Sequence, residues 1–297
     1  MRLGLGTAQF GSDYGVTNAA GKVPPTEVAR MLELAAGRGI KVIDTAAAYG
    51  ESESALGRAL GPDHPFSLVT KCQPVAAQRI GAAEALQVRD AFLRSLERLG
   101  QSSVHGLLVH QAADLRKPGA ELLVEQLLAL KKQGLVHRLG ASLYGAQEIP
   151  AVTCLLKLDI AQVPVSIADQ RLVADGTLRR LRAEGVEIHA RSIFLQGLLL
   201  ADELPPALAG RARPLQRITA HARDAGVTRL ALALGFVGAV PEIDVALVGA
   251  TSCAELEQIL RALDDSPATG DLSHLAVHDE ELLNPSRWPK TAAPSRV

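Results

Sequence analysis

Short apolar runs alternate with longer amphipathic segments from one end of the chain to the other. Each run is almost continuously apolar, which is typical of strands whose two faces are both covered. The runs are residues 3–8, KVIDT, FSLVTK, GLLVH, RLGAS, DIAQVP, VEIHARS and DVALVG. We interpret them as eight parallel strands.

The segments between these runs carry apolar residues at helical spacing. Examples are residues 24–38, ESESALGRAL, the face formed by Val88, Phe92, Leu96 and Leu99, and the face formed by Leu123, Leu127 and Leu130. Glycines stand where several of these helices should end in a left-handed residue: Gly39, Gly61, Gly100 and Gly134. Repeated strand–helix units predict an α/β fold, a closed (β/α)8 TIM barrel, with a doubly wound open sheet as the alternative.

No Ser/Gly-rich or charge-block linker divides the 297 residues. We therefore expect one domain over residues 1–297, with residues 266–297 as a C-terminal tail in which a helix and Trp288 pack on the barrel. No stretch reaches the roughly 18 apolar residues that span a bilayer, and the start MRLGLGTAQFG has no long apolar segment behind it. These features predict a cytoplasmic protein.

The charge and cysteine content exclude several classes of partner. Lys and Arg total 31 against 32 acidic residues, so no overall field attracts nucleic acid or an anionic membrane. Cys72, Cys154 and Cys253 lie far apart and predict reduced thiols rather than a zinc site or disulfide framework. The histidines show no ligand spacing, so we expect no metal.

A barrel carries its active site at the C-terminal ends of its strands. Polar or backbone-exposing residues end the apolar runs at Asp44, Lys71, His110, Ser142, Gln162, Ser192 and Gly249. A single polar residue at a strand end is more often a cap or a satisfied hydrogen-bonding group. A whole rim of them predicts a site.

Four titratable side chains fall in one quadrant of this rim. Tyr49 follows the second strand, which ends at Asp44, while Lys71 and His110 end the next two. A tyrosine normally keeps its proton until about pH 10, and a neighbouring ammonium favours the phenolate. Lys71, kept charged by Asp44, would thus make Tyr49 a tunable acid, and His110 could orient a substrate carbonyl toward its hydroxyl.

These residues resemble the catalytic tetrad of the aldo-keto reductases, and the resemblance covers nearly the whole chain. It is carried by LGLGTAQFG, GIKVIDTAAAYGESESALG, VTK, LLVH, RLGAS, AQVP, ARSIFLQGLL and VGATSCAELEQIL, of which DTA followed by YG and SE is the most specific part. Members of that family are (β/α) barrels that bind an extended nicotinamide dinucleotide, usually the phosphorylated form, and reduce aldehydes or ketones by hydride transfer.

The resemblance implies roles for individual residues. Asp44, Tyr49, Lys71 and His110 match the catalytic positions. At the nicotinamide end of the cofactor, Ser142 and Gln162 match the contacts of the carboxamide, Thr7 matches a contact of the nicotinamide ribose, and Asp44 is a further cofactor contact. Ser192, Phe194 and Gln196 match the contacts of the pyrophosphate, and Gly249, Thr251 and Gln258 match those of the adenosine.

The chain departs from the family pattern at four other positions of the cofactor site. Leu143 replaces an asparagine of the carboxamide grip, Arg191 replaces the aromatic residue that stacks on the nicotinamide, and Ile259 replaces an asparagine near the adenine. Glu255 replaces the arginine that meets the 2′-phosphate. We expect NADPH to stay slightly ahead of NADH, with weak selectivity, because Arg191 or Arg223 could reach the phosphate.

A small or polar, sugar-like carbonyl substrate is expected, because aromatic residues make up only 3% of the chain and the segment after HQAADL is short. The leading hypothesis is therefore a nicotinamide-dependent carbonyl reductase with Tyr49 as general acid. One alternative is a non-catalytic nicotinamide-binding sensor or regulatory subunit. Another is a lyase that uses Lys71 as a Schiff-base nucleophile, against which a carboxylate beside the lysine counts.

Overall fold

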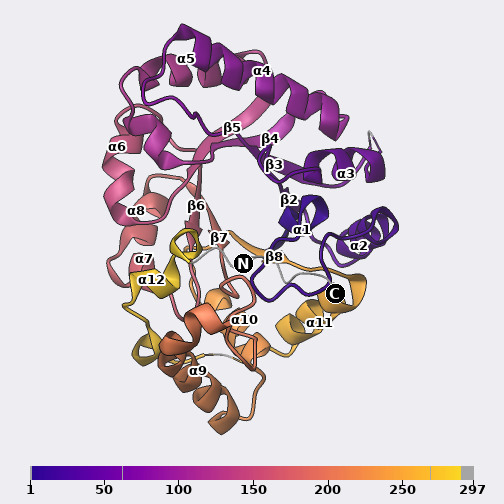
Figure 1. Cartoon of the computed structure of the whole chain (residues 1–297), viewed down its shortest axis with the longest axis vertical. Helices are drawn as coiled ribbons and strands as arrows, with labels where there is room; N and C mark the ends of the chain where they lie inside the picture. The colour runs from indigo at the N-terminus through magenta and orange to yellow at the C-terminus, as the bar shows by residue number, and fades with distance from the viewer. Residues whose placement is uncertain (1, 62, 268, 289–297) are drawn as a thin grey trace.

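The computed structural model describes residues 2–61, 63–267 and 269–288, and within them eight parallel strands close into a barrel (Figure 1). The strands are β1 (Arg2–Gly6), β2 (Val42–Asp44), β3 (Ser67–Lys71), β4 (Val104–Val109), β5 (Val136–Ser142), β6 (Ile160–Pro164), β7 (Glu187–Arg191) and β8 (Val245–Gly249). Each predicted apolar run overlaps one of them, and β1, β4 and β5 begin one or two residues before the run. The closed barrel is thereby confirmed over the open sheet.

The helices form a ring around the strands (Figure 1). They are α1 (Ala8–Gly11), α2 (Pro25–Gly37), α3 (Ser52–Ala59), α4 (Ala82–Leu99), α5 (Ala120–Lys132), α6 (Ile149–Thr153), α7 (Arg171–Ala174), α8 (Thr177–Ala183), α9 (Ala212–Asp224), α10 (Arg229–Gly238), α11 (Cys253–Asp264) and α12 (Glu280–Leu283). In α4 the predicted face is buried, with Val88, Phe92 and Leu99 all turned inward. The helical spacing of apolar residues therefore marks the surface that packs on the strands.

Three of the four predicted glycine caps adopt the left-handed conformation, namely Gly39, Gly100 and Gly134. Gly61 does not, and this prediction is wrong. Helix α3 ends because the backbone of Leu60 is extended, with φ −92° and ψ 135°. The chain turns away there without needing a left-handed residue.

The core has two parts. The larger part lies between the strands and the helices, and a smaller cluster, made by Val42, Val69, Leu108, Ile160, Val245 and Leu247, fills the inside of the barrel. Branched side chains of this kind close the interior of eight-stranded barrels. Chemistry is consequently confined to the rim.

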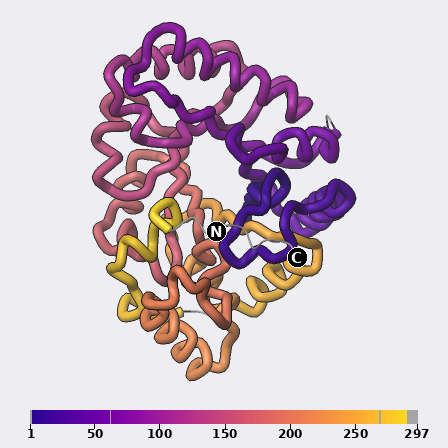
Figure 2. Tube along the Cα trace, in the orientation of Figure 1, coloured from indigo at the N-terminus to yellow at the C-terminus, as the bar shows by residue number. Residues whose placement is uncertain are grey.

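The barrel closes where β1 meets β8, in register from Arg2↔Val245 to Gly6↔Gly249. In Figure 2 the indigo start of the chain lies beside the orange segment that contains β8.

At the N-terminal end of the barrel, the carboxylate of Glu187 lies 3.2 Å from Arg2 Nη2 and 3.3 Å from Arg138 Nη1. Hydrogen bonds to His105 and His189 hold the pKa of Glu187 well below its usual range. This cluster lies at the end of the barrel opposite the candidate site.

The described part of the tail contacts the barrel. The backbone N–H of Val277 donates to Ala168 O at 2.9 Å, and Trp288 packs against the larger core cluster. The indole N–H of Trp288 donates to Leu282 O at 3.0 Å, within the tail itself. The rest of the predicted tail, residues 289–297, lies outside the described residues. Within the described ranges no helix combines the length and the apolar character needed to cross a membrane.

Candidate active site

A buried ion pair lies where β2 and β3 end. Lys71 is 1% exposed, and its Nζ donates to Asp44 Oδ2 at 2.6 Å and to Thr45 O at 2.8 Å. Burial by itself lowers the pKa of Lys71, but the charges of Asp44 and Tyr49 and hydrogen bonds to both raise it above the ordinary value. The lysine therefore remains an ammonium.

Tyr49 and His110 complete this group. Lys71 Nζ lies 4.9 Å from the centroid of the Tyr49 ring, and the His110 ring meets the same ring edge-on, with centroids 5.8 Å apart. The turn that carries Tyr49 is pressed against the backbone of Gly11. Gly50 has φ +56°, and a Cβ there would come within 2.4 Å of Gly11 O. The four residues predicted from the strand ends are thus brought together.

His110 is held in its neutral form. Burial and then the charge of Lys71 lower its pKa to about 4. Its Nδ1 is buried without a hydrogen-bond partner among the described residues. A neutral imidazole has one donor and one acceptor nitrogen, so this ring can serve as a hydrogen-bonding group without carrying a charge.

We expect His110 to make the fold sensitive to acid. Its pKa is about 4 in the folded protein and about 6.5 in an unfolded chain. Between these values the unfolded state binds the extra proton, so stability is lost as the pH falls from about 6.5 toward 4. The free energy of unfolding, measured by denaturant titration from pH 7 to pH 4, should fall less steeply in His110→Gln. Equal slopes in the two proteins would contradict the assignment.

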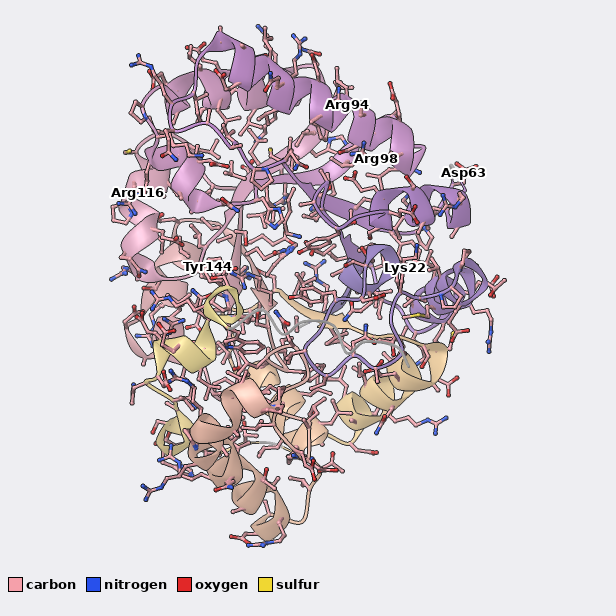
Figure 3. All side chains as sticks on the ribbon, in the orientation of Figure 1. Lys22, Asp63, Arg94, Arg98, Arg116 and Tyr144 are labelled. Carbon is pink, nitrogen blue, oxygen red and sulfur yellow. The ribbon has the colours of Figure 1, made fainter. Side chains whose placement is uncertain are left out.

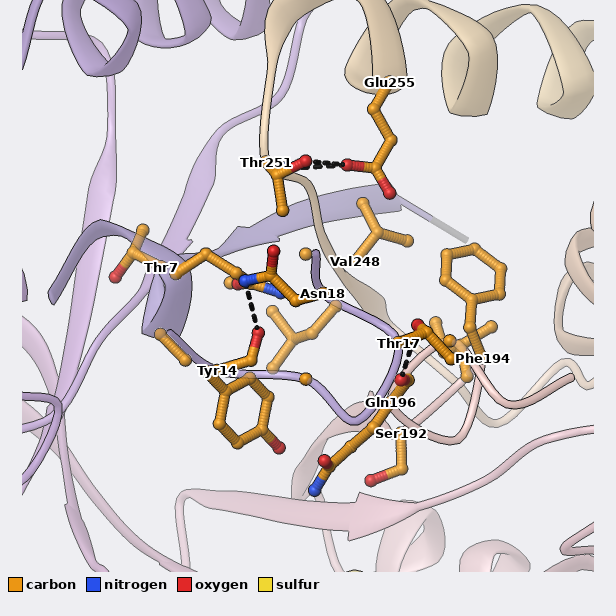
Figure 4. A pocket seen from close by; sticks show the side chains of 18 of the residues that line it. Thr7, Tyr14, Thr17, Asn18, Ser192, Phe194, Gln196, Val248, Thr251 and Glu255 are labelled. Atoms are coloured by element: carbon orange, nitrogen blue, oxygen red, sulfur yellow. Dashed lines mark hydrogen bonds between the residues drawn. The ribbon is translucent and has the colours of Figure 1, made fainter. Parts of the chain in front are cut away.

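A cavity of about 530 Å³ opens beside this group (Figure 4). Asp44 and Tyr49 line one part of it. It is also lined by most residues that the family resemblance assigned to the cofactor: Thr7, Arg191, Ser192, Phe194, Gln196, Gly249, Thr251, Glu255 and Gln258. Two of the predicted catalytic residues, Asp44 and Tyr49, therefore share one cavity with most of the predicted cofactor residues, whereas Lys71 and His110 are not among its lining residues.

Ser142 and Gln162, predicted to hold the nicotinamide carboxamide, are not among the residues that line the cavity. Ser142 is 4% exposed, and Gln162 Nε2 donates to Asp44 Oδ1 at 2.7 Å. Thr7 Oγ1 likewise donates to the backbone oxygen of Asp44 and contacts Ser52 Oγ at 2.8 Å. In this structure Gln162 and Thr7 hold Asp44 in place.

Arg191, predicted to stack on the nicotinamide, lies over an aromatic ring of the protein itself. Its Cζ is 4.3 Å from the centroid of Tyr144, and its Nη2 donates to Leu143 O at 3.1 Å. Figure 3 shows Tyr144 inside the ring of helices, whereas Arg94 and Arg116 are exposed on its outside. The guanidinium is thereby turned toward the end of β5.

The loop after β7 is conformationally strained where it borders the cavity. Ser192, Leu195 and Gln196 have φ between 50° and 59°, and they are the non-glycine residues with positive φ in the described part of the chain. Thr17 Oγ1 donates to Gln196 O at 3.2 Å, which ties the loop to the segment after α1 (Figure 4). Strain of this kind is concentrated at functional sites.

At the other side of the cavity, helix α11 begins with acidic partners. Glu255 Oε2 accepts hydrogen bonds from the N–H and the hydroxyl of Thr251, at 2.6 and 2.7 Å (Figure 4). Glu27 from α2 accepts from the N–H of Cys253 at 2.6 Å. This hydrogen bond is the main cause of a lowered pKa at Glu27.

Sequence reasoning missed two tyrosines and Glu27. Tyr14 lines the cavity with its ring stacked 6.5 Å from that of Tyr49, and Tyr144 lies under Arg191. The chain has only three tyrosines, and all three lie in this region. In a chain so poor in aromatic residues, their position in loops after predicted strands was a usable signal. Glu27 gave none.

Comparison with known proteins agrees with this geometry. The sequence profile described as the Aldo/keto reductase family matches residues 2–271. An aldo-keto reductase of Mycolicibacterium vanbaalenii is 30% identical over 64% of this chain and 66% of its own length, just under two thirds. The L-galactose dehydrogenase of Arabidopsis thaliana is 26% identical over 97% of this chain and 92% of its own.

A solved structure shows the same fold. The holo form of an aldo-keto reductase from Bacillus halodurans superposes with a TM-score of 0.73 at 20% identity, covering 95% of this chain and 92% of that one.

Proposed function

The chain belongs to the aldo/keto reductase family, and from that premise we propose that it is a nicotinamide-dependent oxidoreductase that reduces the carbonyl of a small polar, sugar-like compound. The observation that carries the proposal is the Lys71 ammonium, which lies between the carboxylate of Asp44 and the ring of Tyr49 beside the cavity. Such a tyrosine is suited to act as a general acid.

The residues present fit a dinucleotide. A volume of about 530 Å³ lies within the usual range for cofactor sites. The cavity extends from Tyr49 to Thr251 at the start of α11, and the strained loop after β7 borders it. When bound, the dinucleotide would supply the hydride, and Ser192, Phe194 and Gln196 would hold it along that loop.

The protein's own groups would handle the proton. Tyr49 would donate it to the carbonyl oxygen as negative charge develops there, and Lys71 would stabilise the phenolate that remains. Asp44, held by Gln162 and Thr7, would keep Lys71 charged and in place. Neutral His110 would bind the carbonyl oxygen and orient it toward the tyrosine hydroxyl.

A polar substrate is supported by the groups around Tyr49. Tyr14, Tyr144 and Arg191 offer hydroxyls and a guanidinium rather than a bulky apolar surface. The similarity to an L-galactose dehydrogenase over almost the whole chain supports a sugar in particular. A cytoplasmic location remains a prediction.

The hydrogen bonds of Lys71 argue against the Schiff-base alternative. A nucleophilic lysine must lose its proton, whereas Lys71 Nζ donates to Asp44 and Thr45 and its pKa is raised. Borohydride treatment with an aldehyde and no cofactor should therefore trap no adduct. For the sensor alternative, no observation gives specific support.

The test is a substrate screen in which each reaction is monitored by the absorbance of the reduced nicotinamide. We expect the catalytic efficiency, kcat/KM, for aldoses and small hydroxyaldehydes to exceed that for aryl ketones by about tenfold or more, because one unmatched buried polar contact costs at least that factor. Aryl ketones should be the matched comparison, since they share the carbonyl but lack the hydroxyl groups. A preference for aryl ketones would contradict the polar-substrate proposal, and turnover of neither class would contradict the enzyme.

A further inference from the structure

We propose that the cavity selects the dinucleotide that lacks a 2′-phosphate, and that Glu255 and Glu27 make this selection. The inference rests on the proposed function, because it concerns the adenosine end of the same cavity. It reverses the sequence-based expectation, which placed NADPH slightly ahead.

The first observation is that carboxylates already occupy two of the backbone donors at the start of α11. Free N–H groups at a helix N-terminus normally attract a phosphate. Here Glu27 Oε1 accepts from Cys253 N, and Glu255 Oε2 accepts from Thr251 N, both at 2.6 Å. The N–H of Glu255 itself donates to Ser252 Oγ at 3.2 Å. A 2′-phosphate would have to displace these acceptors.

The second observation is the charge around this helix start. The ionised groups that face Cys253 are the carboxylates of Glu27 and Glu257 and the guanidinium of Arg30. Arg30 and Glu27 neutralise each other, with Nη1 and Oε2 2.9 Å apart, and Glu257 is paired with Arg261 at 3.0 Å. The carboxylate of Glu255, beside Thr251, has no ion-pair partner among the described residues and supplies the uncompensated negative charge. The local field is negative and repels a phosphate dianion.

The two arginines that were expected to reach a 2′-phosphate contact other groups of the protein. Arg191 stacks on Tyr144 and donates to Leu143 O at the end of β5. Arg223 lies in α9, 79% exposed, and pairs with the adjacent Asp224. Phosphate selectivity requires a cation in bidentate reach.

Glu255 also has a carboxylate oxygen, Oε1, that could accept a hydrogen bond from a ribose hydroxyl. Only Oε2 bonds to Thr251, and Oε1 has no hydrogen-bond partner among the described residues. Figure 4 shows Glu255 above the cavity with this second oxygen directed away from Thr251. In dinucleotide sites of the Rossmann type, an acidic side chain accepts a hydrogen bond from the ribose 2′-hydroxyl, and Glu255 would offer the same kind of acceptor here.

The test compares ligands that differ only in the 2′ group, on the intact protein, by isothermal titration. ADP-ribose and its 2′-phosphate isolate the adenosine end, and NADH and NADPH extend the comparison to whole cofactors. We expect the unphosphorylated member of each pair to bind at least tenfold more tightly. Raising the salt concentration should narrow the ratio, because screening weakens the repulsion. Equal binding, or tighter binding of the phosphorylated member, overturns the proposal.

Two variants test the residues. Glu255→Gln keeps an acceptor for Thr251 but removes the charge, and Glu27→Gln does the same at Cys253. Each variant should reduce the ratio of the dissociation constants for the phosphorylated and unphosphorylated ligands by about threefold or more. Thermal unfolding would verify that each variant is folded. The matched control is Glu257→Gln on the same helix, where the carboxylate pairs with Arg261 at 3.0 Å. It should change the ratio less than about twofold, and an equal change in all three variants would refute the assignment to Glu255 and Glu27.

Failure of the proposed function and failure of the selectivity would give different binding results. A protein that binds none of the four ligands would contradict the proposed function itself. A protein that binds both members of each pair with no preference would leave the function standing and overturn only the selectivity.

Discussion

Replacing Tyr49 with phenylalanine is expected to lower kcat for carbonyl reduction about a thousandfold while leaving the dissociation constant of the dinucleotide within about threefold of the wild type. Positioned general acids typically contribute 10²–10⁴-fold to a rate. Phenylalanine retains the ring that faces Lys71 and His110, so it removes a proton rather than a surface. Single-turnover kinetics and cofactor titration would measure the two quantities separately.

Tyr14→Phe is the matched control for that change. The Tyr14 ring stacks on Tyr49 in the same cavity, but among the described residues no hydrogen bond joins Tyr14 to Asp44 or Lys71. We expect the variant to keep kcat within about tenfold and to change mainly KM. Near wild-type turnover in Tyr49→Phe, or an equal loss in both variants, would show that Tyr49 is not the acid.

Replacing Lys71 with methionine should abolish reduction and also destabilise the fold by about 3–5 kcal/mol, which is the usual cost of breaking a buried ion pair by removing one partner. Asp44 is 4% exposed, and among the described residues its carboxylate would keep only the hydrogen bond from the Gln162 amide. Denaturant unfolding gives the stability, and turnover is measured at a temperature where the variant is folded.

The double variant Asp44→Asn with Lys71→Met separates folding from catalysis. Both charges are then gone, so most of the lost stability should return, since a neutral pair of similar volume is often tolerated. Turnover should not return, because the phenolate of Tyr49 still lacks its cation. If stability recovers together with activity, the effect of Lys71 is structural only.

The strands and the four grouped residues could be predicted because they follow from local rules. An apolar run of five or six residues between amphipathic segments marks a covered strand, and its last residue must lie at the rim. Asp44, Lys71 and His110 end three successive runs, so their convergence needs no knowledge of the loops. The structure accordingly brings them together with Tyr49.

Contacts between distant segments could not be predicted in this way. Glu27 accepts a hydrogen bond from the N–H of Cys253, which lies 226 positions away in the sequence. Arg191 stacks on Tyr144, and this contact depends on the conformations of two loops. The role of Gln162 changed for the same reason, because only the packed rim shows that its amide reaches Asp44. The predicted cap at Gly61 was wrong for a local reason, because the extended backbone of Leu60 already ends α3.

The pairing of β1 with β8 has a consequence for how the protein is made. The strand that starts at Arg2 can find its second neighbour only after Val245 has left the ribosome. At about 5–20 residues per second, that delay is on the order of ten to fifty seconds. During this interval one edge of β1 has no partner, and exposed strand edges invite aggregation unless a charged side chain protects them. Arg2, which later pairs with Glu187, places such a charge on the waiting strand. Nascent chains truncated before β8 should therefore depend on chaperones more than the full-length protein does.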